Sequence, residues 1–471
     1  MDSSPRPEQG GSYTKALGKR QVQMIAIGGA IGVGLFLGAG GKLHQVGPSL
    51  IFSYALCGAA AYFVMRALGE LVLHEPSSGS FVTYARKFIG PWAGFASGWL
   101  YWLNWAMTGI AEITAVAIYV HKWLPGIPQW ITALIALGVL LAVNLLSVKL
   151  FGELEFWFSV VKVLAIVVFL ITGLGLVLSG ANIGGTSAGV QNLTNHDGIF
   201  PAGLGITLMT LQAVIFAYSA IELVGIAAGE TKDARKVLPK AINSVVWRIA
   251  VFYVGSVLLL AMLLPWPFYS GDESPFVTVF TRLGIPGIGD VMNAVVLTAA
   301  LSSVNSGLYS TGRILRALSE KGEAPKFVSR MSSRHVPYGG ILFTSVAYLL
   351  GVVLNYLVPK DAFDIAIAIA SLGVVATWAT LIVSQMKLRQ AALRGELERP
   401  SYRMPGAPYT GWATLAFLVL VIALMGFSDG PEKIAFYSIP VVAIVLAVGW
   451  RFIRRRERDR ERTTVAVGSR D

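Results

Sequence analysis

Long apolar stretches separated by short polar segments make up most of this chain. A helix needs about 20 mostly apolar residues to cross the hydrocarbon core of a membrane. Twelve stretches meet that length, and we number them as spans 1 to 12: 22–41, 48–68, 94–120, 129–148, 156–178, 203–229, 242–265, 287–313, 337–357, 362–385, 410–427 and 434–453. The pattern therefore predicts an all-α integral membrane protein with twelve transmembrane helices.

The segments between and around these spans are too short to hold a second folded domain. We expect an N-terminal tail over 1–21, one transmembrane domain over 22–453, and a basic C-terminal tail over 454–471. The first apolar run lacks the features of a cleavable signal peptide, so we expect it to remain as a span. Composition agrees, because only 14% of the residues are charged and the mean hydropathy is +0.64, whereas soluble domains carry about 25% charged residues.

The Lys and Arg residues concentrate on one side of the predicted spans. If the N-terminus lies inside, the inside segments carry thirty of the 38 Lys and Arg residues. The outside segments carry five, namely Lys42, Lys122, Arg282, Lys360 and Lys433. Cytoplasmic loops carry the excess of positive charge in membrane proteins, so both termini are predicted to be cytoplasmic. The net charge of +12 then reflects orientation and attraction to anionic lipid, and we expect no nucleic-acid partner.

Two spans carry residues that favour a break in the helix. Span 1 has five glycines between Gly28 and Gly38, and span 6 has the small and polar run 216–222 near its middle. Each glycine costs roughly 1 kcal/mol against alanine in a helix, and an opened helix is tolerated at membrane depth where it lines a cavity. The alternative is that the glycines form a close helix-packing face.

Matched breaks in two oppositely oriented spans indicate an inverted repeat, as in many secondary transporters. The repeats would be 22–178 and 203–385, with helices over 410–453 appended. Free N–H groups after the span 1 break suit a carboxylate, and free carbonyls at the span 6 break suit an ammonium group. The sequence therefore predicts a site for an α-amino acid, formed by Ile31, Gly32, Val33, Gly34, Phe216, Ala217, Tyr218 and Ser219.

Among the ionisable residues within the predicted spans or at their ends, four are candidates for a role in transport. Lys162 is either a buried ammonium that takes the place of a bound cation or a lysine that reaches back to the inner interface. Glu112 shares a helical stripe with Asn104 and Thr108, which either lines the substrate pathway or joins helices. Glu222 follows the span 6 break and is a candidate for substrate binding or proton coupling.

Two further groups complete the candidates for coupling. Glu230 lies at the end of span 6, where it either acts in coupling or pairs with a nearby basic residue. Ser302 and Ser303 lie in a polar run of span 8. Their hydroxyls either hold a cation or the Lys162 ammonium, or bond to carbonyls of their own helix.

Other kinds of chemistry have no pattern in this sequence. The five histidines form no metal-binding pair, and Cys57 is the only cysteine. Neither a phosphate-binding loop nor a nucleophile–base motif occurs. We therefore expect no metal, no cofactor, no enzymatic activity and no obligate protein partner.

Several motifs resemble the amino acid permeases of the amino acid–polyamine–organocation superfamily. They are residues 23–32, 66–71 and 76–81, together with the span 8 run that ends at Gly307 and Arg313. The resemblance covers residues 12–455 and implies a fold of the leucine-transporter type, with substrate between the unwound parts of spans 1 and 6. It also implies proton-coupled uptake, with Lys162 in place of a sodium ion and with roles for Glu222 and Glu230. Val33 departs from the pattern, because many members have threonine there.

Further segments are similar to those family members that carry L-asparagine, namely 104–109, 239–244 and 354–359. The resemblance therefore implies import of an L-amino acid, with L-asparagine favoured, by proton symport and alternating access in the bacterial cytoplasmic membrane. Asn104, Thr108 or Ser303 would read a neutral amide. Alternatives are the same mechanism with glutamine, GABA, or an aromatic or cationic amino acid, and a membrane amino acid sensor.

Overall fold

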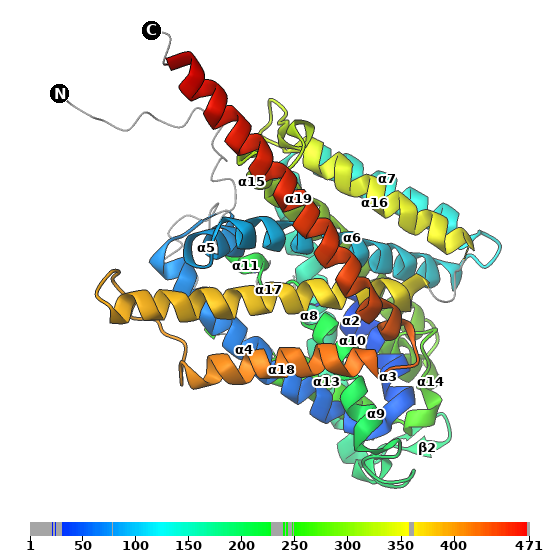
Figure 1. Cartoon of the computed structure of the whole chain (residues 1–471). Helices are drawn as coiled ribbons and strands as arrows, with labels where there is room; N and C mark the ends of the chain where they lie inside the picture. Colours follow the sequence, from blue (N-terminus) through cyan, green and yellow to red (C-terminus); the bar gives the residue numbers. More distant parts are fainter. Residues whose placement is uncertain are drawn as a thin grey trace.

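Helices form almost all of the structure, a computed structural model that describes residues 21, 24, 31–77, 79–227, 239–240, 242–243, 247, 249–357 and 362–468 (Figure 1). Within these ranges, nine helical stretches are long and apolar enough to cross a membrane, and two shorter apolar helices accompany them. The described residues thus form an all-helical membrane protein. The exception is a small antiparallel hairpin of β1 (Asn182–Ile183) and β2 (Thr186–Ser187).

The long helices follow the predicted spans closely. They are α4 (Leu50–His74), α6 (Pro91–His121), α7 (Gln129–Leu146), α8 (Val148–Ser179), α15 (Ile288–Glu320), α16 (Tyr338–Leu357), α17 (Ala362–Leu393), α18 (Tyr409–Gly426) and α19 (Pro431–Gly468). The largest difference at a helix start is in α8, which begins eight residues before the predicted span at 156. The Ser147 side chain caps it by accepting a hydrogen bond from the Leu150 amide at 3.0 Å.

Helices are interrupted where the sequence predicted breaks. In span 1, Gly32 is extended and is followed by α2 (Val33–Phe36) and α3 (Gly38–Val46). In span 6, α9 (Gly203–Met209) and α10 (Leu211–Ala217) precede a turn that contains Ala220 at a φ of +67°, and α11 (Leu223–Ala227) follows. The first half of span 1 and Glu230 lie outside the described residues.

The chain folds back on itself between α3 and α4. Gly47 has a φ of +63°, and a Cβ there would lie 2.6 Å from Pro201 Cγ, so this turn requires glycine. The 3-10 turn η1 (Gly47–Ser49) leads into α4, where the Tyr54 hydroxyl donates a hydrogen bond to the Gly34 carbonyl at 3.4 Å. The start of α4 therefore lies beside α2.

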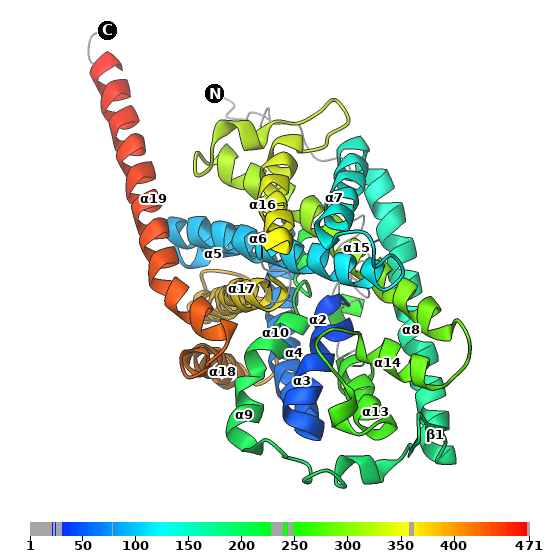
Figure 2. The ribbon, with the colours of Figure 1, turned by 90° about the vertical axis from the view of Figure 1, so that its right-hand side faces the viewer.

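Several short elements lie between the long helices. They are α5 (Ser80–Phe88), η2 (Val190–Leu193), the π-helical turn η4 (Ile249–Gly255), α13 (Ser256–Leu263), η5 (Trp266–Phe268), α14 (Pro275–Arg282) and η6 (Lys326–Ser329). Figure 2 shows α6 crossing the middle of the molecule close to α2, α10 and α17. Eight of the predicted candidate residues lie together near this crossing.

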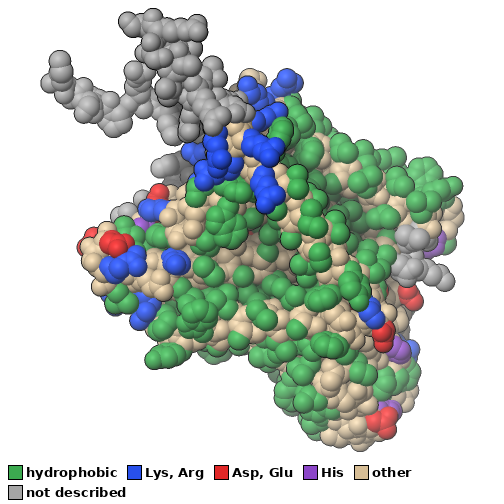
Figure 3. Space-filling view, viewed as in Figure 1, with side chains coloured by type: hydrophobic (Ala, Val, Ile, Leu, Met, Phe, Trp, Pro, Cys, Tyr) green, Lys and Arg blue, Asp and Glu red, His purple; other side chains and the backbone are tan. Residues whose placement is uncertain are grey.

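The outer helices expose apolar side chains and carry a basic end. Ile171, Trp412 and Val441 are each at least 60% exposed, as expected for surfaces that face lipid rather than water. Hydrophobic side chains cover much of the face in Figure 3, and basic side chains gather at its upper edge. The segment predicted as a C-terminal tail over 454–471 continues α19 as helix as far as Gly468.

Candidate functional site

A small buried cavity lies where α2, α6, α10 and α15 meet. It is lined by Gly32, Gly34, Trp105, Thr108, Glu112, Phe216, Ala217, Ser219, Ala220 and Ser303. Its volume is about 10 Å³, room for about one water molecule. Eight of its ten lining residues were predicted from the sequence. The structure therefore brings the two helix breaks and the polar stripe of α6 to one place.

Two glycines allow the backbones around the cavity to come this close. A Cβ on Gly34 would lie 2.6 Å from Ala217 Cα, so α2 and α10 touch backbone to backbone. A Cβ on Gly32 would lie 2.8 Å from Ser303 Oγ and 2.9 Å from Glu112 Oε1. Real Cβ atoms do not tolerate such distances. A larger residue at Gly34 would force α2 and α10 apart, whereas one at Gly32 would displace the ends of the Ser303 and Glu112 side chains.

Glu112 brings the only carboxylate to the cavity lining. It is 2% exposed, and its Oε1 accepts a hydrogen bond from the Val33 amide at 3.5 Å. Its Oε2 has no hydrogen-bond partner among the described residues. A buried carboxylate oxygen without a donor is costly, so this atom is the strongest unpaired acceptor facing the cavity.

The polar stripe on α6 faces the protein interior, as predicted. The Thr108 hydroxyl donates to Asn104 Oδ1 at 3.3 Å, and both side chains are buried. Asn104 itself does not line the cavity. It packs against α17, where a Cβ on Gly373 would lie 2.4 Å from Asn104 Cβ. Asn104 therefore orients the Thr108 hydroxyl without itself lining the cavity.

The remaining predicted residues lie around the cavity rather than on its wall. Ile31 and Val33 are buried beside it, and the Tyr218 hydroxyl points to the Tyr54 carbonyl, to which it donates at 2.8 Å. Glu222 is buried in the turn after α10, and its Oε1 has no hydrogen-bond partner among the described residues. Trp105 and Ala220 line the cavity without having been predicted, because an aromatic or a small residue in an apolar span has no distinguishing pattern.

Lys162 is fully buried between α8 and α15. Its Nζ donates to Ser302 Oγ at 2.9 Å, so the side chain does not reach back to an interface. Glu155 lies on the same helix, with Oε1 3.9 Å from Lys162 Nζ, and is equally buried. The sequence analysis missed Glu155 because that residue falls one position outside the predicted span 5.

A vestibule of about 900 Å³ leads from one end of the molecule to Gly34, which it shares with the buried cavity. Charged pairs stand at its mouth. Lys42 Nζ lies 3.2 Å from Glu432 Oε1, and Lys122 Nζ lies 2.5 Å from Glu273 Oε1. All four of these residues line the vestibule.

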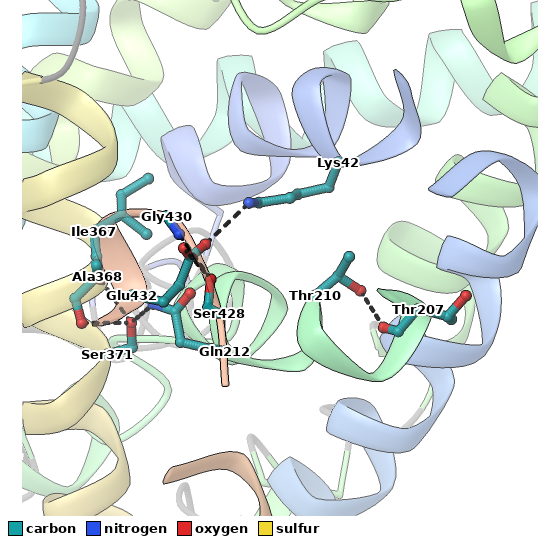
Figure 4. A network of polar contacts seen from close by, with 10 residues as sticks. All are labelled: Lys42, Thr207, Thr210, Gln212, Ile367, Ala368, Ser371, Ser428, Gly430 and Glu432. Carbon is teal, nitrogen blue, oxygen red and sulfur yellow. Dashed lines mark hydrogen bonds and ion pairs between the residues drawn. The ribbon is translucent and has the colours of Figure 1, made fainter. Parts of the chain in front are cut away.

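Figure 4 shows the polar contacts that join helices near the entrance of the vestibule. Lys42 of α3 reaches the first turn of α19, where Ser428 Oγ also donates to Glu432 Oε2 at 3.0 Å. Nearby, Gln212 of α10 donates to Ser371 of α17. Both interrupted helices are thus held to elements from the C-terminal part of the chain.

The family model for amino acid permeases matches residues 21–463. This chain belongs to the amino acid permease family. The permease is therefore a multi-pass membrane transporter of amino acids and not an enzyme, which agrees with its exposed apolar helices and central polar cavity.

Individual relatives match the permease over nearly its whole length. It is 55% identical to the L-asparagine permease of Salmonella typhimurium over 96% of this chain and 91% of the relative. It is 54% identical to the L-asparagine permease of Escherichia coli, over 94% of this chain and 89% of the relative. The L-asparagine permease of Streptomyces coelicolor is 53% identical, over 94% of this chain and 91% of the relative.

Proposed function

We propose that this permease imports L-asparagine by proton symport with alternating access. The observation that carries the proposal is the cavity at the two helix breaks, since it offers groups for each end of an α-amino acid together with hydroxyls for a polar side chain. The relatives described above are L-asparagine permeases, which favours asparagine among amino acids.

The backbone of the amino acid would bind to the ends of the interrupted helices. Its carboxylate would meet the N–H groups of Val33 and Gly34 at the start of α2, where the helix dipole favours a negative charge. Its ammonium group would meet carbonyls at the end of α10 around Phe216 and Ala217. The carboxylate of Glu112 already accepts from the Val33 amide, so substrate and Glu112 would compete for that donor.

The side-chain amide would be read by hydroxyls on the opposite wall. Because the Thr108 hydroxyl already donates to Asn104, its lone pairs remain available to accept from the amide NH2 group. Ser303 brings a second hydroxyl to the cavity. A site built to hydrogen-bond a polar group rejects analogues that lack it, since its own buried groups would then stay unpaired.

Transport requires that the site open to each side in turn. The cavity must expand, because about 10 Å³ is far below the volume of an amino acid. We propose that ten of the twelve predicted spans form the inverted repeat 22–178 and 203–385, with the last two spans appended, and that rocking of these parts opens and closes the vestibule. Both termini would be cytoplasmic, which makes the vestibule the external entrance.

Coupling to protons would involve the buried ionisable residues. Lys162, held by Ser302, takes the position of a bound cation, and a change in its protonation would accompany the change in facing. Glu222 lies at the other break with an unpaired oxygen in the described structure and is a second carrier. Glu230 is proposed from the sequence resemblance alone.

The test is uptake of labelled asparagine into proteoliposomes under an imposed inward proton gradient, with each unlabelled amino acid as competitor. Concentrative uptake that collapses with an uncoupler and is blocked only by asparagine and close analogues is the expected result. Absence of gradient-driven uptake would exclude proton symport.

One observation favours a second candidate substrate class. The unpaired Glu112 Oε2 would suit a cationic side chain, so lysine and arginine belong among the competitors. Strong competition by either would reassign the substrate.

A further inference from the structure

A second buried polar cluster lies between α8 and α15, outside the substrate cavity. It consists of Glu155, Ser159 and Lys162 on α8 and Ser302 on α15, none of them more than 1% exposed. Lys162 Nζ lies 3.9 Å from Glu155 Oε1, so the ammonium and the carboxylate neutralise one another. Loss of either partner would leave an uncompensated buried charge. The cluster therefore behaves as one unit.

The hydrogen bonds in this unit have a fixed direction. The Lys162 ammonium only donates, so Ser302 Oγ accepts from it at 2.9 Å. Ser302 then donates its single proton to Glu155 Oε1 at 2.7 Å, and Ser159 Oγ is 3.5 Å from the same oxygen. The result is a continuous path from ammonium through hydroxyl to carboxylate.

We propose that Glu155 accepts the proton that Lys162 releases during transport, with Ser302 as the relay. The proton leaves Lys162 Nζ for Ser302 Oγ as the Ser302 proton moves to Glu155 Oε1. A neutral amine, an unchanged hydroxyl and a neutral carboxylic acid result, so charge and protons balance. The inference rests on the proton symport proposed above and names a carrier within it.

The position of Glu155 gives the transfer a direction. Glu155 precedes Lys162 by seven residues, about 10 Å along the helix, toward the end of α8 proposed to be cytoplasmic. Its Oε2 has no hydrogen-bond partner among the described residues. Glu155 is therefore placed to pass the proton inward once that side opens.

Few other charged groups face this path among the described residues. One is Glu112 of α6, a carboxylate whose charge attracts the Lys162 ammonium. On α15, Arg313 covers the Tyr309 ring at 3.4 Å, and that ring stacks on Phe151 of α8 at 3.9 Å. The described helices α7 and α13, which also pack against α8, bring no charged residue.

A nearby carboxylate provides a matched control. Glu153 lies two residues from Glu155 on α8 and accepts a hydrogen bond from Gln21 at 2.7 Å. It is only partly buried, whereas Glu155 is fully buried, because residues two apart point to different sides of a helix. Its substitution tests for general effects on this part of α8.

The experiment compares proton-driven net uptake with asparagine exchange at equal pH on both sides. Net uptake requires the carrier to release its proton, whereas exchange of loaded carriers does not. Glu155→Gln is expected to lower net uptake at least tenfold and flatten its pH dependence, with exchange within about threefold of the parent protein. Glu155→Asp should restore part of net uptake, and Glu153→Gln should leave both activities unchanged.

A second variant covers the case in which Glu155→Gln does not fold. Ser302→Ala keeps both charges and removes the relay, so it should show the same selective loss of net uptake. The inference would be overturned if either variant kept the net uptake and the pH dependence of the parent protein. It would also be overturned if net uptake and exchange fell equally and Glu155→Asp restored neither. If the parent protein itself shows no gradient-driven uptake, proton symport fails instead.

Discussion

Gly34 and Ala217 approach so closely that the cavity depends on the absence of a side chain at position 34. We predict that Gly34→Ala abolishes most uptake and destabilises the protein by about 1–3 kcal/mol, because the new Cβ would meet backbone atoms that cannot rotate away. Thermal unfolding and uptake in proteoliposomes check this. Gly138→Ala on α7 is the control, since its Cβ would meet no atom within 4 Å. Equal behaviour of the two variants would contradict the close contact.

Thr108 offers a test of how the side chain of the substrate is recognised. Thr108→Val keeps the shape of the residue and removes the hydroxyl that would accept from the amide. We expect asparagine uptake to fall about tenfold, the effect of losing one hydrogen bond of about 1.4 kcal/mol. Competition by amino acids with apolar side chains should not fall with it. A uniform loss for all competitors would assign Thr108 a packing role.

The candidate residues predicted from the sequence are those that stand out from an apolar background. Gly32, Gly34, Glu112 and Ser303 were predicted because glycine breaks and buried polar groups are unusual within spans, and the structure places them on one cavity. Glu155 could not be found in this way. Its own charge, together with Glu153, lowers the hydropathy and moved the predicted start of span 5 to residue 156, although the helix begins at Val148.

At the scale of elements, one carboxylate holds three segments together. Glu70 of α4 is fully buried and accepts from Arg399 Nε at 2.6 Å, from Gln385 Nε2 at 2.9 Å and from the Met404 amide at 2.8 Å. From the sequence, Glu70 stood out only as part of the motif over residues 66–71. Its partners show that it fixes the connection between α17 and α18 against α4.

Removing that charge should release the connection. We predict that Glu70→Gln destabilises the protein by about 3 kcal/mol, because the partly buried Arg399 head group would lose its counter-charge and the new NH2 group would face donors. Unfolding temperature and limited proteolysis over 394–408 measure the effect.

The control for this prediction lies on the same connection. Glu396 pairs with Arg394 at the surface, where both side chains are more than half exposed, so Glu396→Gln should leave the unfolding temperature nearly unchanged. If Glu70→Gln were no more sensitive to protease than Glu396→Gln, Glu70 would not be what fixes this connection.

The ends of the long helices were less predictable than their places along the chain. The chain order of helices follows the apolar stretches, since a lipid-facing helix needs a fixed apolar length. Helix ends depend on capping hydrogen bonds and on the helix preference of the flanking polar residues, which hydropathy does not measure. The cap at Ser147 extends α8, and the arginine-rich segment after 453 continues α19 as helix to Gly468.

At the scale of the whole molecule, the vestibule and the single cysteine together allow a direct test of facing and orientation. Cys57 is fully buried, with Sγ 3.6 Å from the Leu211 carbonyl, so the parent protein should not react with a membrane-impermeant maleimide. Gln45 is exposed and lines the vestibule, whereas Lys321 is exposed at the end of α15. We predict that Gln45→Cys is labelled in intact cells and that Lys321→Cys is labelled only after permeabilisation.

Substrate should then change the labelling at one of these positions. If the site opens to each side in turn, asparagine with a proton gradient should close the vestibule and slow the labelling of Gln45→Cys. The labelling rate of Lys321→Cys in permeabilised cells should stay the same. Labelling of Lys321→Cys from outside would reverse the proposed orientation. An unchanged rate at Gln45→Cys during active transport would mean that access to the site is not controlled at this mouth, and the charged pairs of Lys42 and Lys122 would then be structural.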